Sequence, residues 1–178
     1  SDQHFAKSIE RSERVTLGFF INPANKKLDS SDLEQLDFSQ YSIVQRFDDR
    51  TKPLPLRQIF SVGLSIPELM NAANAAGYVS FVPEMDGVVR WVPTLMQHGE
   101  YMFPPLSLQL AREAVQSPLA VDIYEFGIEK MALGEIPIPV KENGDILINY
   151  YGPPFTFDHI SATDVLTRKV GQEELSGK

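Results

Sequence analysis

The chain has 178 residues, of which 43% are hydrophobic and 22% are charged, proportions typical of a folded globular domain and unlike those of a disordered chain. Its formal net charge of −8 argues against binding to nucleic acid or to an anionic membrane surface, because both require clustered Lys and Arg. The absence of cysteine excludes disulfides, thiolate catalysis and Cys-ligated zinc.

The first third of the chain predicts one helix, two strands and two loops. Phe5 and Ile9 lie four residues apart, the spacing of one helix face, and Asp2 is placed to cap that helix. In chain order, we expect a helix over residues 3–12, a buried strand over 14–21, an excursion loop over 22–40, a strand over 41–47 and a loop or hinge over 48–56.

From residue 65 onward, the capping and turn signals are denser. Pro67 and Glu68 follow Ser65 as they would in the first turn of a helix, and Asn143-Gly144 tolerates the positive φ angles of a hairpin turn. We expect a helix from 65 that ends at Gly77, strands over 78–82 and 88–96 joined by a turn at 83–87, a turn at 98–99, a helix opened by Pro104 or Pro105, a hairpin of 136–140 with 145–150, and a short helix capped by Ser161. This alternation predicts an α/β fold, a mixed β-sheet flanked by helices in a single domain.

Residue types that commonly carry catalysis are scattered along the sequence. The three histidines are not spaced as metal ligands, and no Gly-x-Ser-x-Gly elbow, phosphate-binding glycine loop or dinucleotide fingerprint occurs. Neighbouring carboxylates lie in predicted turns, where Asp and Glu are common for conformational reasons: Asp48 with Asp49, Glu84 with Asp86, and Glu142 with Asp145. We predict no catalytic residue, no metal site and no cofactor, while a hydrolase with two facing carboxylates stays as a minor alternative.

Residues 86–93 (DGVVRWVP) are the most distinctive segment. A strand here places Val88, Arg90 and Val92 on one face and Trp91 on the other, so Arg90 is expected among apolar neighbours. A guanidinium in such surroundings needs a partner. Two interpretations stay open: a buried tie to Glu84, Asp86 or a carbonyl group, or an arginine that holds an anion in a ligand pocket.

A second aromatic segment poses the same choice. Tyr150 and Tyr151 precede the rigid pair Pro153-Pro154, so their rings either line a pocket or close the edge of a core. The predicted ligand-binding residues are therefore Asp86, Arg90, Trp91, Tyr150 and Tyr151.

Residues 76–83 (AGYVSFVP) and 85–93 (MDGVVRWVP), read together, resemble the central motif of the second class of CHASE-type domains, the cyclase- and histidine-kinase-associated sensory extracellular domains. The likeness continues, in the family's order, through residues 2–6 with 15–18, 103–111 (FPPLSLQLA), 148–154 (INYYGPP) and 160–166 (ISATDVL). It covers most of residues 2–178. The motifs depart from the family at Glu84, where a paired aspartate is usual.

The resemblance implies an extracytoplasmic sensory domain, periplasmic or extracellular, over residues 2–178 of a bacterial membrane receptor. The implied outputs are adenylate or diguanylate cyclases, histidine kinases or Ser/Thr kinases, and the membrane is reached only through flanking helices outside this chain. The implied partner is an unidentified small molecule or an envelope protein, so a protein-interaction or dimerisation module is the alternative function.

The family pattern also has strand and helix material before residue 2 and a strand after residue 178. We therefore expect this chain to be a partial domain, truncated at both ends. Sheet edges left open in this way can pair with other chains, which predicts self-association.

Overall fold

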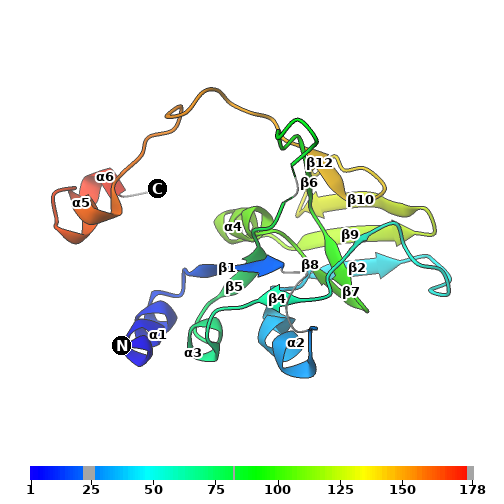
Figure 1. Ribbon diagram of the computed structural model, residues 1–178, viewed down its shortest axis with the longest axis horizontal. Helices are drawn as coiled ribbons and strands as arrows, with labels where there is room; N and C mark the ends of the chain where they lie inside the picture. Colours follow the sequence, from blue (N-terminus) through cyan, green and yellow to red (C-terminus); the bar gives the residue numbers. More distant parts are fainter. Residues whose placement is uncertain (22–26, 82, 176–178) are drawn as a thin grey trace. The chain divides into compact units, whose positions relative to one another are not determined.

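The structure, a computed structural model, describes residues 1–21, 27–81 and 83–175 (Figure 1). The chain divides into two compact units, Ser1–Ile148 and Asn149–Lys178, and each is described by itself.

The first unit is a mixed α/β structure whose described strands form four small sheets. Its helices are α1 (Asp2–Ser12), α2 (Ser30–Leu36), the 3-10 helix η1 (Asp37–Ser39), α3 (Pro67–Met70) and α4 (Leu106–Val115). The sheets have the orders β4-β1-β5 (Val62–Gly63, Thr16–Ile21, Ala75–Tyr78), β11-β10-β9-β2 (Ile136–Pro137, Gly127–Leu133, Leu119–Tyr124, Ile43–Arg46), β12-β6 (Asp145–Leu147, Trp91–Pro93) and β3-β7-β8 (Arg57–Gln58, Met96–His98, Tyr101–Phe103). Parallel and antiparallel pairs occur together in the first, second and fourth sheets, so the predicted α/β class with mixed sheets and flanking helices is confirmed.

Two clusters of buried side chains form the core of this unit. Along β9, Leu119, Val121 and Ile123 alternate toward one face and are fully buried, as the two-residue period of a strand requires. Around β1 and β5, the Phe19 ring meets those of Tyr78 and Phe103 edge-to-face, with centroids 6.3 and 6.4 Å apart. The strand β8 contributes to both clusters, through Met102 to the first and Phe103 to the second.

Gly77 has a different role from the predicted helix end. It lies buried in β5, and the helix expected to reach it ends at Met70. A Cβ atom on Gly77 would lie 2.5 Å from the backbone of Leu106, the first residue of α4. Gly77 is therefore needed for close strand–helix contact, while Gln109 of α4 donates to the Ala76 carbonyl at 2.8 Å.

The expected loop over residues 22–40 is wrong in its second half, which contains α2 and η1. The signal is a capping box: the Asp29 carboxylate accepts from the Asp32 backbone N–H, and the Asp32 carboxylate accepts from the Asp29 backbone N–H. Residues 22–26 lie outside the described residues. The helix over 3–12, the strands at 14–21 and 41–47, the loop at 48–56 and the helix opened by Pro105 are confirmed. The expected burial of the first strand is wrong, because in β1 only Phe19 is buried and Phe20 is 64% exposed.

The two predicted hairpins form their turns but not their strand pairs. The Gly87 N–H donates to Glu84 and the Gly144 N–H to Lys141, so both turns close locally. The strands on either side of these turns pair elsewhere: β6 with β12, β7 with β3 and β8, and β11 with β10. Local turn chemistry fixed each reversal, whereas burial against distant segments selected the strand partners. Val82 lies outside the described residues.

The second unit contains two short helices, α5 (Ala162–Leu166) and α6 (Gln172–Leu175). The predicted helix after Ser161 is confirmed, although the Ser161 side chain makes no capping hydrogen bond. Within this unit, Tyr151 and Phe157 meet edge-to-face at 6.0 Å, and both rings are largely exposed.

Candidate ligand pocket

Arg90 lies on the surface and not among apolar neighbours. Its side chain is 44% exposed and forms ion pairs with Glu84 at 2.7 Å and Asp86 at 2.8 Å. The predicted burial is wrong because β6 begins only at Trp91, which leaves Arg90 in the loop before it. The guanidinium of Arg90 holds the pKa of the Asp86 carboxyl below its usual value. The partners expected of a structural arginine are thus present, and binding of a ligand by Arg90 and Asp86 stays a prediction.

Trp91 is half-buried on β6 and lines a cavity in the first unit. Its backbone pairs with Leu147 of β12, and the Lys141 Nζ atom lies 3.4 Å from the centroid of its ring system. That distance is within the range of a cation–π contact, which fixes Lys141 over one face of the ring. Trp91 is the predicted site residue that the structure places in the cavity, where Arg90 and Asp86 do not lie.

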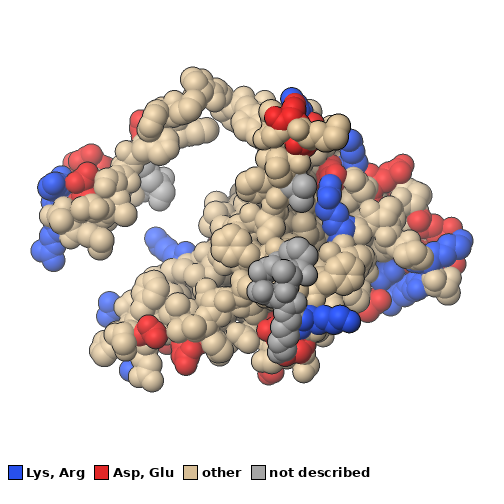
Figure 2. Space-filling view, in the orientation of Figure 1, with Lys and Arg blue, Asp and Glu red and all other residues tan. Residues whose placement is uncertain are grey.

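The cavity has a volume of about 380 Å³, within the range usual for small-molecule pockets. Its apolar walls come from β1, β6, β7 and the loops after β3 and β5, namely Ile21, Phe60, Phe81, Trp91, Pro93 and Met96. Its polar lining consists of Arg57, Gln58, Ser61 and Ser80. Over the face of the molecule in Figure 2, acidic and basic side chains are interspersed, yet none of the described residues that line this cavity is acidic.

Arg57 is the charged residue of the cavity lining, and the sequence reasoning missed it. It lies on β3, where its Nε and Nη2 atoms donate to the two carboxylate oxygens of Asp145 at 3.2 and 3.0 Å. Asp145, on β12, is only 6% exposed and also accepts from the Asn143 amide at 2.9 Å. A buried carboxylate therefore fixes the direction of Arg57. Little in the sequence points to this contact. Arg57 has no acidic partner in a predicted turn of its own, and Asp145, the carboxylate that it binds, lies 88 residues later in a segment that the sequence predicts as a turn.

Two serine hydroxyl groups add polar character to the apolar walls. Ser80 Oγ accepts from the Ile21 N–H at 2.8 Å, and it donates to no partner among the residues that the structure describes. Ser61 is 3% exposed, and its hydroxyl has no hydrogen-bond partner within the described ranges. A buried polar group without a partner is uncommon in folded proteins.

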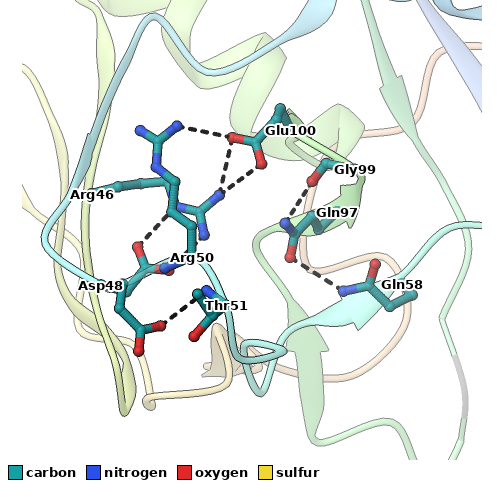
Figure 3. A network of polar contacts seen from close by, with 9 residues as sticks. Arg46, Asp48, Arg50, Thr51, Gln58, Gln97, Gly99 and Glu100 are labelled. Carbon is teal, nitrogen blue, oxygen red and sulfur yellow. Dashed lines mark hydrogen bonds and ion pairs between the residues drawn. The ribbon is translucent and has the colours of Figure 1, made fainter.

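A second polar network lies beside this lining (Figure 3). Arg46 donates to Asp48 through Nε at 2.9 Å and Nη2 at 2.6 Å, and its Nη1 lies 3.1 Å from Glu100. Asp48 is 3% exposed, and its hydrogen bonds with Arg46 lower its pKa to about 2. Gln58, which lines the cavity, donates to Gln97 at 3.2 Å in the same view. The network fixes the loop that leads into β3 and thus the strand that carries Arg57.

Tyr150 and Tyr151 belong to the second unit, and both side chains are exposed there. Their predicted part in ligand binding stays a prediction.

These observations define an α/β domain with a ligand-sized, largely apolar cavity that contains one anchored arginine. The model of the CHASE2 domain family matches residues 1–178, and the chain belongs to this family. CHASE2 domains are extracellular sensory domains, as the sequence motifs suggested. Searches of curated proteins and of solved structures found no match. Among the described residues, no helix has both the length and the apolar character needed to cross a bilayer.

Proposed function

We propose that this chain is the extracytoplasmic input domain of a bacterial transmembrane receptor, non-catalytic itself, whose output is a nucleotide cyclase, a histidine kinase or a Ser/Thr kinase. The match to the CHASE2 family over residues 1–178 carries this proposal. The cavity beside Arg57 supports it, because a receptor domain requires a place where a stimulus binds one state of the protein better than another.

A membrane-topology experiment on the full gene product tests the proposal. Alkaline phosphatase, active only outside the cytoplasm, is fused after this domain, and a green fluorescent protein that matures in the cytoplasm is fused at the end of the full gene product. We expect phosphatase activity from the first fusion and fluorescence from the second. A third fusion places the green fluorescent protein inside this domain. If that fusion fluoresces while the phosphatase fused after the domain is inactive, the domain lies in the cytoplasm and the proposal is overturned.

A protein-interaction module is the second candidate, and a cluster of exposed rings favours it. Phe47 stacks on Tyr124 with centroids 4.7 Å apart, and Tyr124 stacks on Phe126 at 5.7 Å. Phe47 and Phe126 are each about half exposed, beside the edge strand β2. We propose that the domain also self-associates. Light scattering at high protein concentration tests this, and a monomer at every concentration would contradict it.

A carboxylate-dependent hydrolase gains no support from the described residues. Such an enzyme requires one carboxyl group with a raised pKa facing a second across a cleft. Asp48, Asp49 and Asp86 each have a pKa shifted downward, by hydrogen bonds from an arginine or from backbone N–H groups.

A further inference from the structure

We infer that the cavity between Arg57 and Trp91 binds a small apolar monocarboxylate, with the carboxylate on Arg57 and the hydrocarbon part against the aromatic walls. This inference rests on the proposed sensory function, since it assigns a ligand class and a site to that function. The argument follows from the charges, the walls and the unused hydrogen-bond donors of the cavity.

The charges of the cavity favour an anion. The chain carries 24 acidic and 16 basic residues, yet Arg57 is the charged residue of the described lining and no acid accompanies it there. Lys141 does not line the cavity, but it places a second cation over the ring of Trp91, which does. Asp145, which offsets one positive charge, lies behind Arg57 as a buried partner and not in the lining. A single negative charge is therefore what this site can balance.

The unused donors of Arg57 favour a carboxylate over a spherical anion. A guanidinium has five N–H groups in a planar fork. Asp145 takes one from Nε and one from Nη2, and the described residues take none from Nη1. The Nη1–Nη2 end of the fork is thus left for a second planar acceptor, and paired N–H donors match the two oxygens of a carboxylate.

The walls select the rest of the ligand. Phe60, Phe81, Trp91 and Met96 provide aromatic and thioether surfaces. A hydroxylated or highly charged ligand would lose water there without recovering its hydrogen bonds, whereas a ring or a branched chain would bury apolar area favourably. Ser61 and Ser80 offer hydroxyl groups for one further polar atom of the ligand.

The position of the site also suits a sensor. Arg57 binds Asp145 of β12, and Trp91 pairs with Leu147 of the same strand. A ligand that contacts Arg57 and Trp91 therefore contacts two of the residues that hold β12 in place. After β12, the chain passes within two residues to Asn149, where the second unit begins. Occupancy of the cavity therefore favours the state in which β12 is paired, and the chain carries this difference toward its C-terminal part.

The test uses Trp91, the single tryptophan of the chain, as a built-in reporter. The full chain is titrated with phenylacetate, with its uncharged analogue phenylacetamide and with acetate, while the Trp91 fluorescence is recorded and calorimetry is run in parallel. We expect saturable binding of phenylacetate, and binding of phenylacetamide and acetate weaker by roughly tenfold or more, because each lacks one half of the recognition.

Variants locate the site. The pair Arg57→Gln with Asp145→Asn removes both charges without leaving a buried carboxylate unpaired, and we expect it to weaken phenylacetate binding roughly tenfold or more. Arg50→Gln, which removes an exposed arginine outside the cavity, is the matched control and should bind as the wild type does. Near-UV circular dichroism checks that each variant is folded.

Three results would overturn the inference: no saturable phenylacetate signal at millimolar concentration, equal affinity for the acid and the amide, or unchanged binding in a folded double variant. The comparison of acid with amide requires no variant, so the test does not depend on the double variant being stable. Failure here leaves the topology experiment unaffected, so the ligand assignment and the sensory function fail separately.

Discussion

Two arginines of this domain bind carboxylates, and they differ in how near and how buried those carboxylates are. Arg57 reaches across 88 residues to Asp145, which is 6% exposed, whereas Arg90 binds Glu84 and Asp86 within its own turn, where all three side chains are more than 40% exposed. The sequence singled out the second arginine because it lies in the distinctive segment 86–93, among residues expected to be apolar strand neighbours. The structure places the first in the lining of the cavity, so a local motif can identify a turn and miss a residue that lines a cavity elsewhere.

The first prediction makes the largest change. Arg57→Gln leaves Asp145 buried with the Asn143 amide as its remaining side-chain partner, and we expect the free energy of unfolding to fall by about 3 kcal/mol. Urea unfolding followed by circular dichroism measures this. Arg50→Gln should change stability by less than about 0.5 kcal/mol. Equal effects of the two substitutions would show that the Arg57–Asp145 pair contributes no more than a surface arginine.

The second prediction removes the other half of the pair. In Asp145→Asn, Arg57 loses its carboxylate, but the 45% exposed side chain can be hydrated by water. We therefore expect a smaller loss than for Arg57→Gln, about 1–2 kcal/mol, in the same urea experiment. A larger loss for Asp145→Asn than for Arg57→Gln would reverse the assignment of which group is the buried one.

The third prediction concerns pH and the Arg46–Asp48 pair, which is buried like Asp145 but local like the Arg90 turn. The folded-state pKa of the Asp48 carboxyl, about 2, lies below its ordinary value of 3.8, so its ionised form stabilises the fold fully above about pH 4. This contribution is lost as the pH falls from about 4 to about 2. The stability difference between wild type and Asp48→Asn, measured by urea unfolding across this range, should shrink as the pH falls. A constant difference would contradict the prediction.

The fourth prediction is the smallest. Arg90→Gln should lower the free energy of unfolding least of the four, since exposed ion pairs are hydrated and screened. The small loss should decrease further in high salt, and phenylacetate binding should be unchanged. Loss of binding in a folded Arg90→Gln variant would instead return the ligand site to the turn of residues 84–90.

The sequence predicted elements that depend on local signals. The strand within 14–21, the start of α4 at Pro104 or Pro105 and the closed turns at Gly87 and Gly144 could all be inferred, because neighbouring residues determine them. The family could also be inferred, since its motifs are short and ordered. Gly77 shows the limit: a glycine after an alanine-rich run resembles a helix end, and only the approach of Leu106 shows why a strand requires glycine there.

The site was predicted in part, for the same reason. Trp91 lines the cavity, but Arg57, Ser61 and Met96 converge on it from separate strands and loops. Their proximity depends on strand partners that burial selects over long distances along the chain. The expected partner of β12 was the segment 136–140, and its actual partner is β6. The Arg57–Asp145 contact could not be inferred without that pairing.

An NMR titration of the ¹⁵N-labelled chain with phenylacetate tests the central claim most directly, because it reports which residues the ligand contacts. The account predicts that the indole N–H of Trp91, the Nε–H of Arg57 and the backbone amides of β12 shift together with one affinity, while the amides of residues 84–90 do not. Shifts confined to residues 84–90, or no shift at Trp91 and Arg57 at saturating ligand, would contradict it.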